Sequence, residues 1–194
     1  MLMNTHLIIG KSLLDNIDSN KSFLISEKNF LYGNIKPDVT SKYLFNKHYL
    51  DESLEMIISK ISNLCNLTIN SLSKYFSISK FSQEIGVICH FLCDFFCVAH
   101  SERWEMTHSF NKHVNYEKNL NMSAKDIDLS KYKGQSLDSN FENFFNTLYS
   151  EYKNKLDYDN DLYFSTYVCN SVIDYILDCI LKNTAQSYTL IKCG

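Results

Sequence analysis

The chain has 194 residues, a formal net charge of −3 and a single arginine, Arg103, which excludes the broad cationic surface that grips duplex DNA or RNA. Hydrophobic residues make up 45% of the chain and charged residues 21%, so the sequence is too apolar for disorder. We expect residues 1–194 to form a single domain with a substantial core, and no duplex nucleic acid as a partner.

Helices are expected along the whole chain, because it has one proline, five glycines and no long alternation of apolar and polar residues. The fold class predicted is all-α, a single-domain multi-helix bundle. Periodicity and helix-end signals place seven helices, at Thr5–Ile17, Ser22–Tyr32, Asp51–Tyr75, Lys80–Val98, Thr107–Asn121, Asn140–Leu156 and Asp161–Lys182.

The helix predicted at Lys80–Val98 is apolar around most of its circumference, which is typical of a central helix. The polar residues 122–140 are predicted to form a surface loop, and the two helices after it to close the bundle without chemistry of their own.

Three cysteines, Cys89, Cys93 and Cys97, recur every four residues and are predicted to share one helical face. They could form a thiolate metal site, but buried cysteines more often pack as small hydrophobic residues. The chain has seven cysteines and no export signal, so we expect reduced thiols.

The N-terminus lacks the basic and apolar regions of a signal peptide, and no run of about 18 apolar residues occurs. From the sequence we therefore expect a cytoplasmic protein without a transmembrane segment, making at most transient contact with a membrane surface.

The central helix contains His90 and Asp94 four residues apart, a spacing that places both side chains on one face. His100 follows and can turn back toward them, and His113 and Glu117 repeat the four-residue spacing on the next helix. Each pair alone is common on solvated helices. However, polar groups inside an apolar helix cost several kcal/mol unless they are paired or bind a metal.

Three further candidates lie upstream. Asp38 follows Gly33-Asn34-Ile35-Lys36-Pro37, which we interpret as a helix-ending turn; His48 comes ten residues later, and His6 opens the first helix. Histidine nitrogens and carboxylate oxygens are zinc ligands, whereas His108 falls outside this set and is expected to be exposed.

The order of these residues resembles the zinc site of the zinc-dependent, bacterial phospholipase C family, which is similar to that of single-strand-specific zinc nucleases. The corresponding residues are His6, Asp38, His48, His90, Asp94, His100, His113 and Glu117. The resemblance implies two or three Zn²⁺ ions in the core of the bundle and hydrolysis of a phosphodiester by a zinc-activated water.

The resemblance also implies how the ligands are shared. One ion is held by Asp38, His48, His90 and Asp94, and Asp94 bridges it to a second ion bound by His6. A third ion is held by His100, His113 and Glu117, and Asp38 is the candidate general base. Secreted members use an N-terminal tryptophan at the His6 ion, so from Met1 we expect a weak contribution at most.

Three functions remain open at this point. The first is hydrolysis of a phospholipid or other phosphodiester, the second is cleavage of single-stranded nucleic acid, with Phe95, Phe96 or Trp104 as stacking residues, and the third is a zinc-stabilised protein without catalysis. The oligomeric state and the head group preferred are not determined by the sequence.

Overall fold

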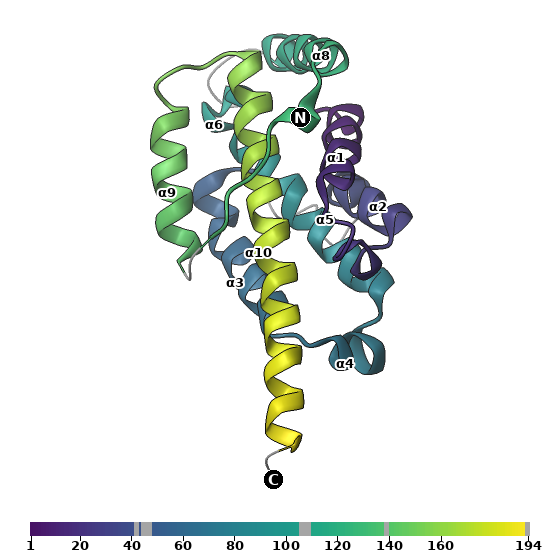
Figure 1. Ribbon diagram of the computed structural model, residues 1–194. Helices are drawn as coiled ribbons and strands as arrows, with labels where there is room; N and C mark the ends of the chain where they lie inside the picture. The colour runs from purple at the N-terminus through teal and green to yellow at the C-terminus, as the bar shows by residue number, and fades with distance from the viewer. Residues whose placement is uncertain (41–42, 44–47, 105–109, 138–139, 193–194) are drawn as a thin grey trace.

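The computed structural model describes all residues except 41–42, 44–47, 105–109, 138–139 and 193–194. Within this described part the chain forms helices and no strand, arranged as a bundle around a central helix, α5 (Ile78–Phe95) (Figure 1). The predicted all-α fold class is confirmed.

The first part of the chain contains α1 (Met3–Asn16), a 3-10 turn (Ser22–Leu24) and α2 (Glu27–Val39). The prediction that Pro37 sits in a helix-ending turn is wrong, because α2 continues through it and carries Asp38. A proline removes one backbone donor and crowds the preceding turn. Here α2 packs closely along α5 and ends two residues after Pro37, so tertiary packing outweighs the local preference.

The single helix predicted at Asp51–Tyr75 is also wrong. Instead, α3 (Leu50–Cys65) is followed by a short α4 (Ile69–Ser71) and a π-helical turn (Leu72–Phe76). Thr68 and Ser71 form a reciprocal capping box that starts the new helix. The Nδ2 atom of Asn183 donates to the carbonyls of Cys65 and Leu67, at 2.7 and 3.2 Å, and fixes the break.

After α5 come α6 (Val98–Ser101), α8 (Phe110–Asp126), a 3-10 turn (Leu129–Lys131), α9 (Phe141–Tyr152) and α10 (Tyr158–Lys192). The surface loop predicted at 122–140 therefore begins only after Asp126. The last helix continues ten residues beyond the predicted Lys182 and projects from the end of the bundle (Figure 1).

One stretch of α10, Tyr158–Thr189, is long and apolar enough to cross a membrane by length and composition alone. Its most apolar 18-residue window is 67% buried within the fold, and the core helix of a soluble protein meets the same criterion. The apolarity of α10 is therefore accounted for by packing within the bundle.

Two glycines allow α2 and α5 to approach each other at the level of their backbones. A Cβ atom on Gly86 would lie 2.3 Å from the Phe30 carbonyl oxygen, and one on Gly33 would lie 2.4 Å from that of Gln83. Neither backbone can move aside cheaply, so only glycine fits at these positions. The close approach brings the C-terminal turn of α2, with Asp38, alongside His90 on α5.

A neighbouring face of α5, together with Phe96 directly after the helix, packs on α9 and α10. The Phe96 ring lies 5.2 to 5.8 Å from the rings of Phe145, Tyr149, Tyr152 and Phe164. The Cys93 Sγ atom lies 3.8 Å from that of Cys169. These contacts form an apolar core that uses aromatic rings and thiols and no ionised group.

Candidate metal centre

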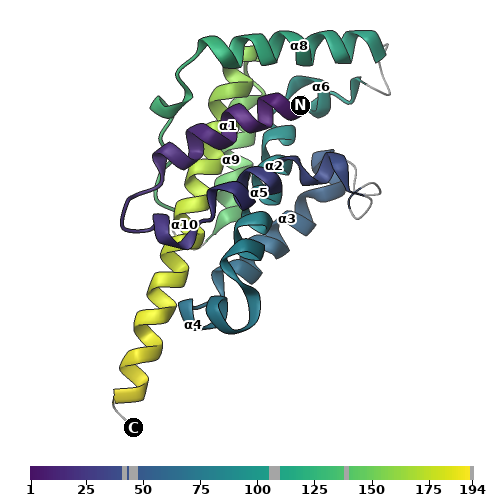
Figure 2. The ribbon, with the colours of Figure 1, turned by 90° about the vertical axis from the view of Figure 1, so that its right-hand side faces the viewer.

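The structure brings all eight residues selected from the sequence into one cluster, which is buried except at Asp38 and His48. They come from α1 (His6), α2 (Asp38), the segment before α3 (His48), α5 (His90 and Asp94), α6 (His100) and α8 (His113 and Glu117). In Figure 2, α8 lies across one end of the bundle, close to α1 and α6. His108 lies outside the described residues.

Asp94 stands at the centre of the cluster. Its Oδ2 atom lies 2.7 Å from His48 Nδ1 and 3.2 Å from His90 Nε2. Its Oδ1 atom faces the other way, at 3.3 Å from His6 Nε2 and 3.6 Å from His100 Nε2. The two oxygens of one carboxylate thus serve two different groups of nitrogen donors.

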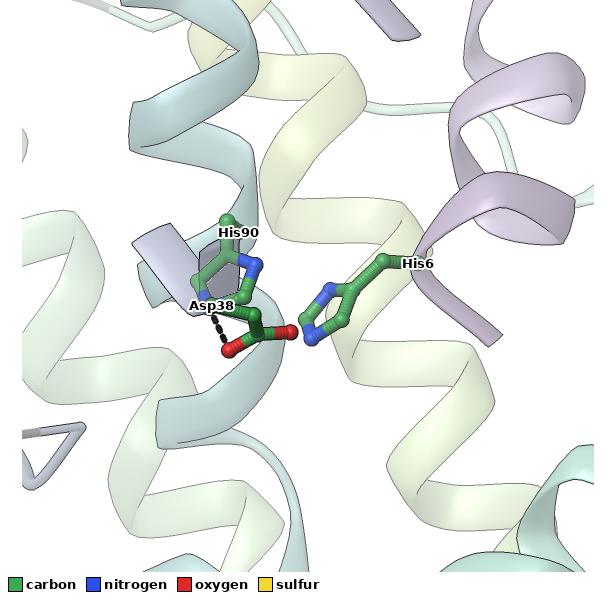
Figure 3. A group of neighbouring side chains, drawn as sticks. All are labelled: His6, Asp38 and His90. Carbon is green, nitrogen blue, oxygen red and sulfur yellow. Dashed lines mark ion pairs between the residues drawn. The ribbon is translucent and has the colours of Figure 1, made fainter. Parts of the chain in front are cut away.

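Asp38 completes the first group from the side of α2. Its Oδ1 atom lies 3.5 Å from His90 Nε2 and 3.9 Å from His48 Nδ1. Figure 3 shows the Asp38 carboxylate beside the rings of His90 and His6, with its ion pair to His90 as a dashed line. Ligand atoms of His6, Asp38 and His90 lie within 4.8 Å of one another, as do those of His48, His90 and Asp94.

The second group is built around Glu117. Its Oε1 atom lies 3.0 Å from His100 Nε2 and 3.1 Å from His113 Nε2. The α-amino nitrogen of Met1 lies 3.1 Å from the same oxygen and 2.8 Å from His100 Nε2, and it donates to Asp94 Oδ1. The amino group therefore sits among the ligand-type atoms, and the weak contribution to metal binding expected of Met1 stays a prediction.

His6 is the most informative residue of the cluster. Its side chain is fully buried, its ring stacks on His90 at 4.0 Å, and neither ring nitrogen makes a hydrogen bond within the described part of the chain. A buried imidazole without such partners costs free energy. Zinc takes nitrogen from neutral histidine and oxygen from carboxylates, so this set of residues fits zinc.

One histidine is oriented by the backbone of α2. The Nδ1 atom of His90 lies 2.8 Å from the carbonyl oxygen of Asn34. Because a carbonyl can only accept, Nδ1 carries the proton and the Nε2 lone pair faces the cluster. The sequence could not identify this partner, because the contact depends on the glycine-mediated approach of α2 to α5.

Burial and the neighbouring charged groups shift the pKa values of several residues in the cluster. Burial, together with the neighbouring His90, lowers the pKa of His6 to about 3, and burial and the Met1 amino group lower that of His100. Burial alone would raise the pKa of Asp94, but the Met1 amino group and the surrounding histidines hold it well below its usual value. At neutral pH His6 and His100 are therefore neutral and Asp94 is ionised, the forms that bind metal. Burial alone would lower the pKa of His48, but its hydrogen bond to Asp94 raises it.

Among the eight described residues of the cluster, exposure to solvent is greatest at one edge. The side chains of Asp38 and His48 are 27% and 21% exposed, whereas those of the other six residues are at most 9% exposed. A substrate can therefore approach on the side of Asp38 and His48.

A buried carboxylate outside the cluster, Asp161, holds the surrounding elements together. It accepts hydrogen bonds from the backbone N–H of Val98 (3.0 Å), the hydroxyl of Tyr116 (3.0 Å) and that of Tyr152 (2.9 Å). Burial raises its pKa to about 7. Nothing in the sequence pattern indicates this role, since an aspartate in the first turn of a helix is ordinary.

A sequence model for a protein family described as zinc dependent phospholipase C matches residues 5–159. The matched stretch contains all eight residues of the cluster. The chain has no significant match among curated proteins or among solved structures.

Proposed function

We propose, because this chain belongs to the zinc-dependent phospholipase C family, that it hydrolyses the head-group phosphodiester of a phospholipid. The observation that supports this most directly is the position of Asp94, whose two oxygens face separate groups of nitrogen donors. A carboxylate in this arrangement can bridge two cations, and adjacent cations suit phosphodiester chemistry.

The residues divide into sets that would hold the ions. Asp38, His48, His90 and Asp94 would hold one zinc, and Asp94 would share a second with His6 and the nearby amino group of Met1. His100, His113 and Glu117 would hold a third. His90 would bind through Nε2, because its Nδ1 donates to Asn34.

When bound, zinc lowers the pKa of a water ligand to about 7 and neutralises charge on phosphoryl oxygens. Asp38 lies at the exposed edge, where its carboxylate can accept a proton from the attacking water. The water oxygen forms a bond to phosphorus as the bond to the glyceride oxygen breaks. The proton then passes to that leaving oxygen, which gives a diglyceride and a phosphorylated head group.

The test compares wild type with Asp94→Asn for zinc content, measured by elemental analysis, and for hydrolysis of phosphatidylcholine vesicles and bis-p-nitrophenyl phosphate. We expect two or three zinc ions in the wild type, and in the variant a loss of metal and of more than about a hundredfold in activity, since even indirect ligand partners are worth 10–100-fold. Asp174→Asn is the matched control, because Asp174 lies on α10 and is 44% exposed.

The other possible results would favour one of the two alternative functions or overturn the proposal. Zinc without turnover would favour the zinc-stabilised, non-catalytic alternative, and a wild type without zinc would overturn the proposal. Cleavage of single-stranded DNA or RNA in place of lipid would favour the nuclease. Phe95 and Phe96 cannot stack on bases as suggested from the sequence, because they are 1% and 0% exposed; of the three candidates, only Trp104 is partly exposed.

A further inference from the structure

Cys97 does not lie with Cys89 and Cys93, the two cysteines with which its four-residue spacing grouped it. Because α5 ends at Phe95, Cys97 lies beyond the helix in extended backbone (φ −119°, ψ 121°). The prediction that it shares one helical face with Cys89 and Cys93 is therefore wrong. Cys89 and Cys93 face Cys169 on α10, whereas the thiol of Cys97 lies beside the metal centre.

The backbone of Cys97 is fixed between two residues of the cluster. Its N–H donates to the Asp94 carbonyl at 3.1 Å, and its own carbonyl accepts from the His100 N–H at 2.9 Å. The side chain is fully buried. The orientation of the thiol is thus set by the same turn that places His100.

Ligand-type atoms of Cys97, His100 and Glu117 lie within 4.8 Å of one another. Donors to one tetrahedral zinc ion sit about 2.0 Å (nitrogen or oxygen) and 2.3 Å (sulfur) from it, so two of them lie about 3.3 to 3.5 Å apart. Shifts on the order of 1 Å therefore bring all three donors onto one ion. Mixed cysteine, histidine and carboxylate ligation is ordinary for zinc.

We propose that Cys97 is a ligand of the ion held by His100, His113 and Glu117. The inference rests on the proposed function, because it requires the metal centre. On binding, the thiol proton is released to solvent and a zinc–sulfur bond forms. A thiolate is a soft donor, so this position should favour zinc over magnesium or manganese and hold its ion more tightly than oxygen and nitrogen ligands alone would.

The test uses the full-length chain loaded with Co²⁺ in place of zinc and recorded by absorption spectroscopy. We expect a near-ultraviolet thiolate-to-cobalt charge-transfer band in the wild type that is lost in Cys97→Ser. Cys93→Ser is the matched control, because Cys93 is equally buried and lies on the α10 side of α5. It should keep the band.

A second measurement is competition with a zinc chelator, in which Cys97→Ser should lose at least about tenfold in affinity for one ion while circular dichroism confirms that it is folded. Bound cobalt without a thiolate band in the wild type would overturn the assignment of Cys97 and leave the proposed function standing. A wild type that binds no metal would overturn both. Because the absence of the band from the wild type overturns the assignment by itself, the test does not depend on how well a variant folds.

Discussion

The two buried faces of α5 differ in whether the protein itself supplies partners for their polar atoms. The histidine face, formed by Gly86, His90 and Asp94, packs against α1 and α2. The cysteine face, formed by Cys89 and Cys93 and extended by Phe96 directly after the helix, packs against α9 and α10. The side chains of both faces are fully excluded from solvent. Burial therefore does not distinguish them; the chemistry of the buried atoms does.

The cysteine face is satisfied by the protein itself. The Cys169 thiol donates to the Cys89 carbonyl, the Ser165 hydroxyl donates to the Cys93 carbonyl, and aromatic rings surround Phe96. On the histidine side, the His6 ring that stacks on His90 lacks hydrogen bonds, and Asp94 is crowded by nitrogen donors. One face stabilises the fold, and the other has the composition of a ligand-binding site.

Among the changes that test the difference between the two faces, Gly86→Ala is expected to have the largest effect. The added Cβ would overlap the Phe30 carbonyl and force α2 away from α5. This moves both Asp38 and the Asn34 carbonyl that orients His90. We expect destabilisation above about 3 kcal/mol, beyond the usual cost of overpacking, together with loss of zinc. Urea unfolding and elemental analysis measure the two effects.

The control for Gly86→Ala is Gly10→Ala on α1, where the new Cβ would meet the ends of side chains, at 3.2 Å from Leu31 and 3.4 Å from Asn34. This variant should retain zinc. A Gly86→Ala protein with full zinc content would show that the approach of the two helices does not position the ligands.

Phe96→Ala tests whether the cysteine face contributes to stability without affecting metal binding. Removing a fully buried aromatic ring should cost about 3–5 kcal/mol of unfolding free energy, because a cavity remains among its four aromatic neighbours. Zinc content per folded molecule should stay at the wild-type value. Loss of zinc in a folded Phe96→Ala protein would mean that the two faces are not independent.

The smallest expected effect concerns Asp161, which links the elements around both faces. Its pKa of about 7 lies above the ordinary value of an aspartate, so the folded state keeps a proton that the unfolded chain loses. Its contribution to stability is therefore complete below about pH 4 and is lost as the pH rises through 7, a change on the order of 3 kcal/mol.

This pH dependence is measured as the difference in unfolding free energy between wild type and Asp161→Asn, both loaded with zinc, from pH 4.5 to 7.5. The subtraction removes the contributions of other groups, among them His6 and His100, whose lowered pKa values give the opposite sign. The difference should fall with rising pH. A difference that is constant over this range would contradict the raised pKa.

Much of the architecture follows from local signals in the sequence. The absence of strand-like alternation predicts helices, and the apolar circumference of the segment around His90 predicts its central position. The boundaries were less predictable where tertiary contacts decided them. Pro37 stays inside α2 because of packing on α5, and α3 stops at Cys65, where Asn183 on α10 holds the carbonyls that follow.

The sequence by itself determined which residues are candidate ligands, because residue type and order along the chain are chemical information that folding does not alter. Only the tertiary structure decided which of them meet, since these contacts join residues far apart in the chain. The contact of His90 with Asn34, the position of Met1 among the ligands and the separation of Cys97 from Cys93 all depend on how helices pack and where they end. The short-range periodicity of the sequence does not predict these distances.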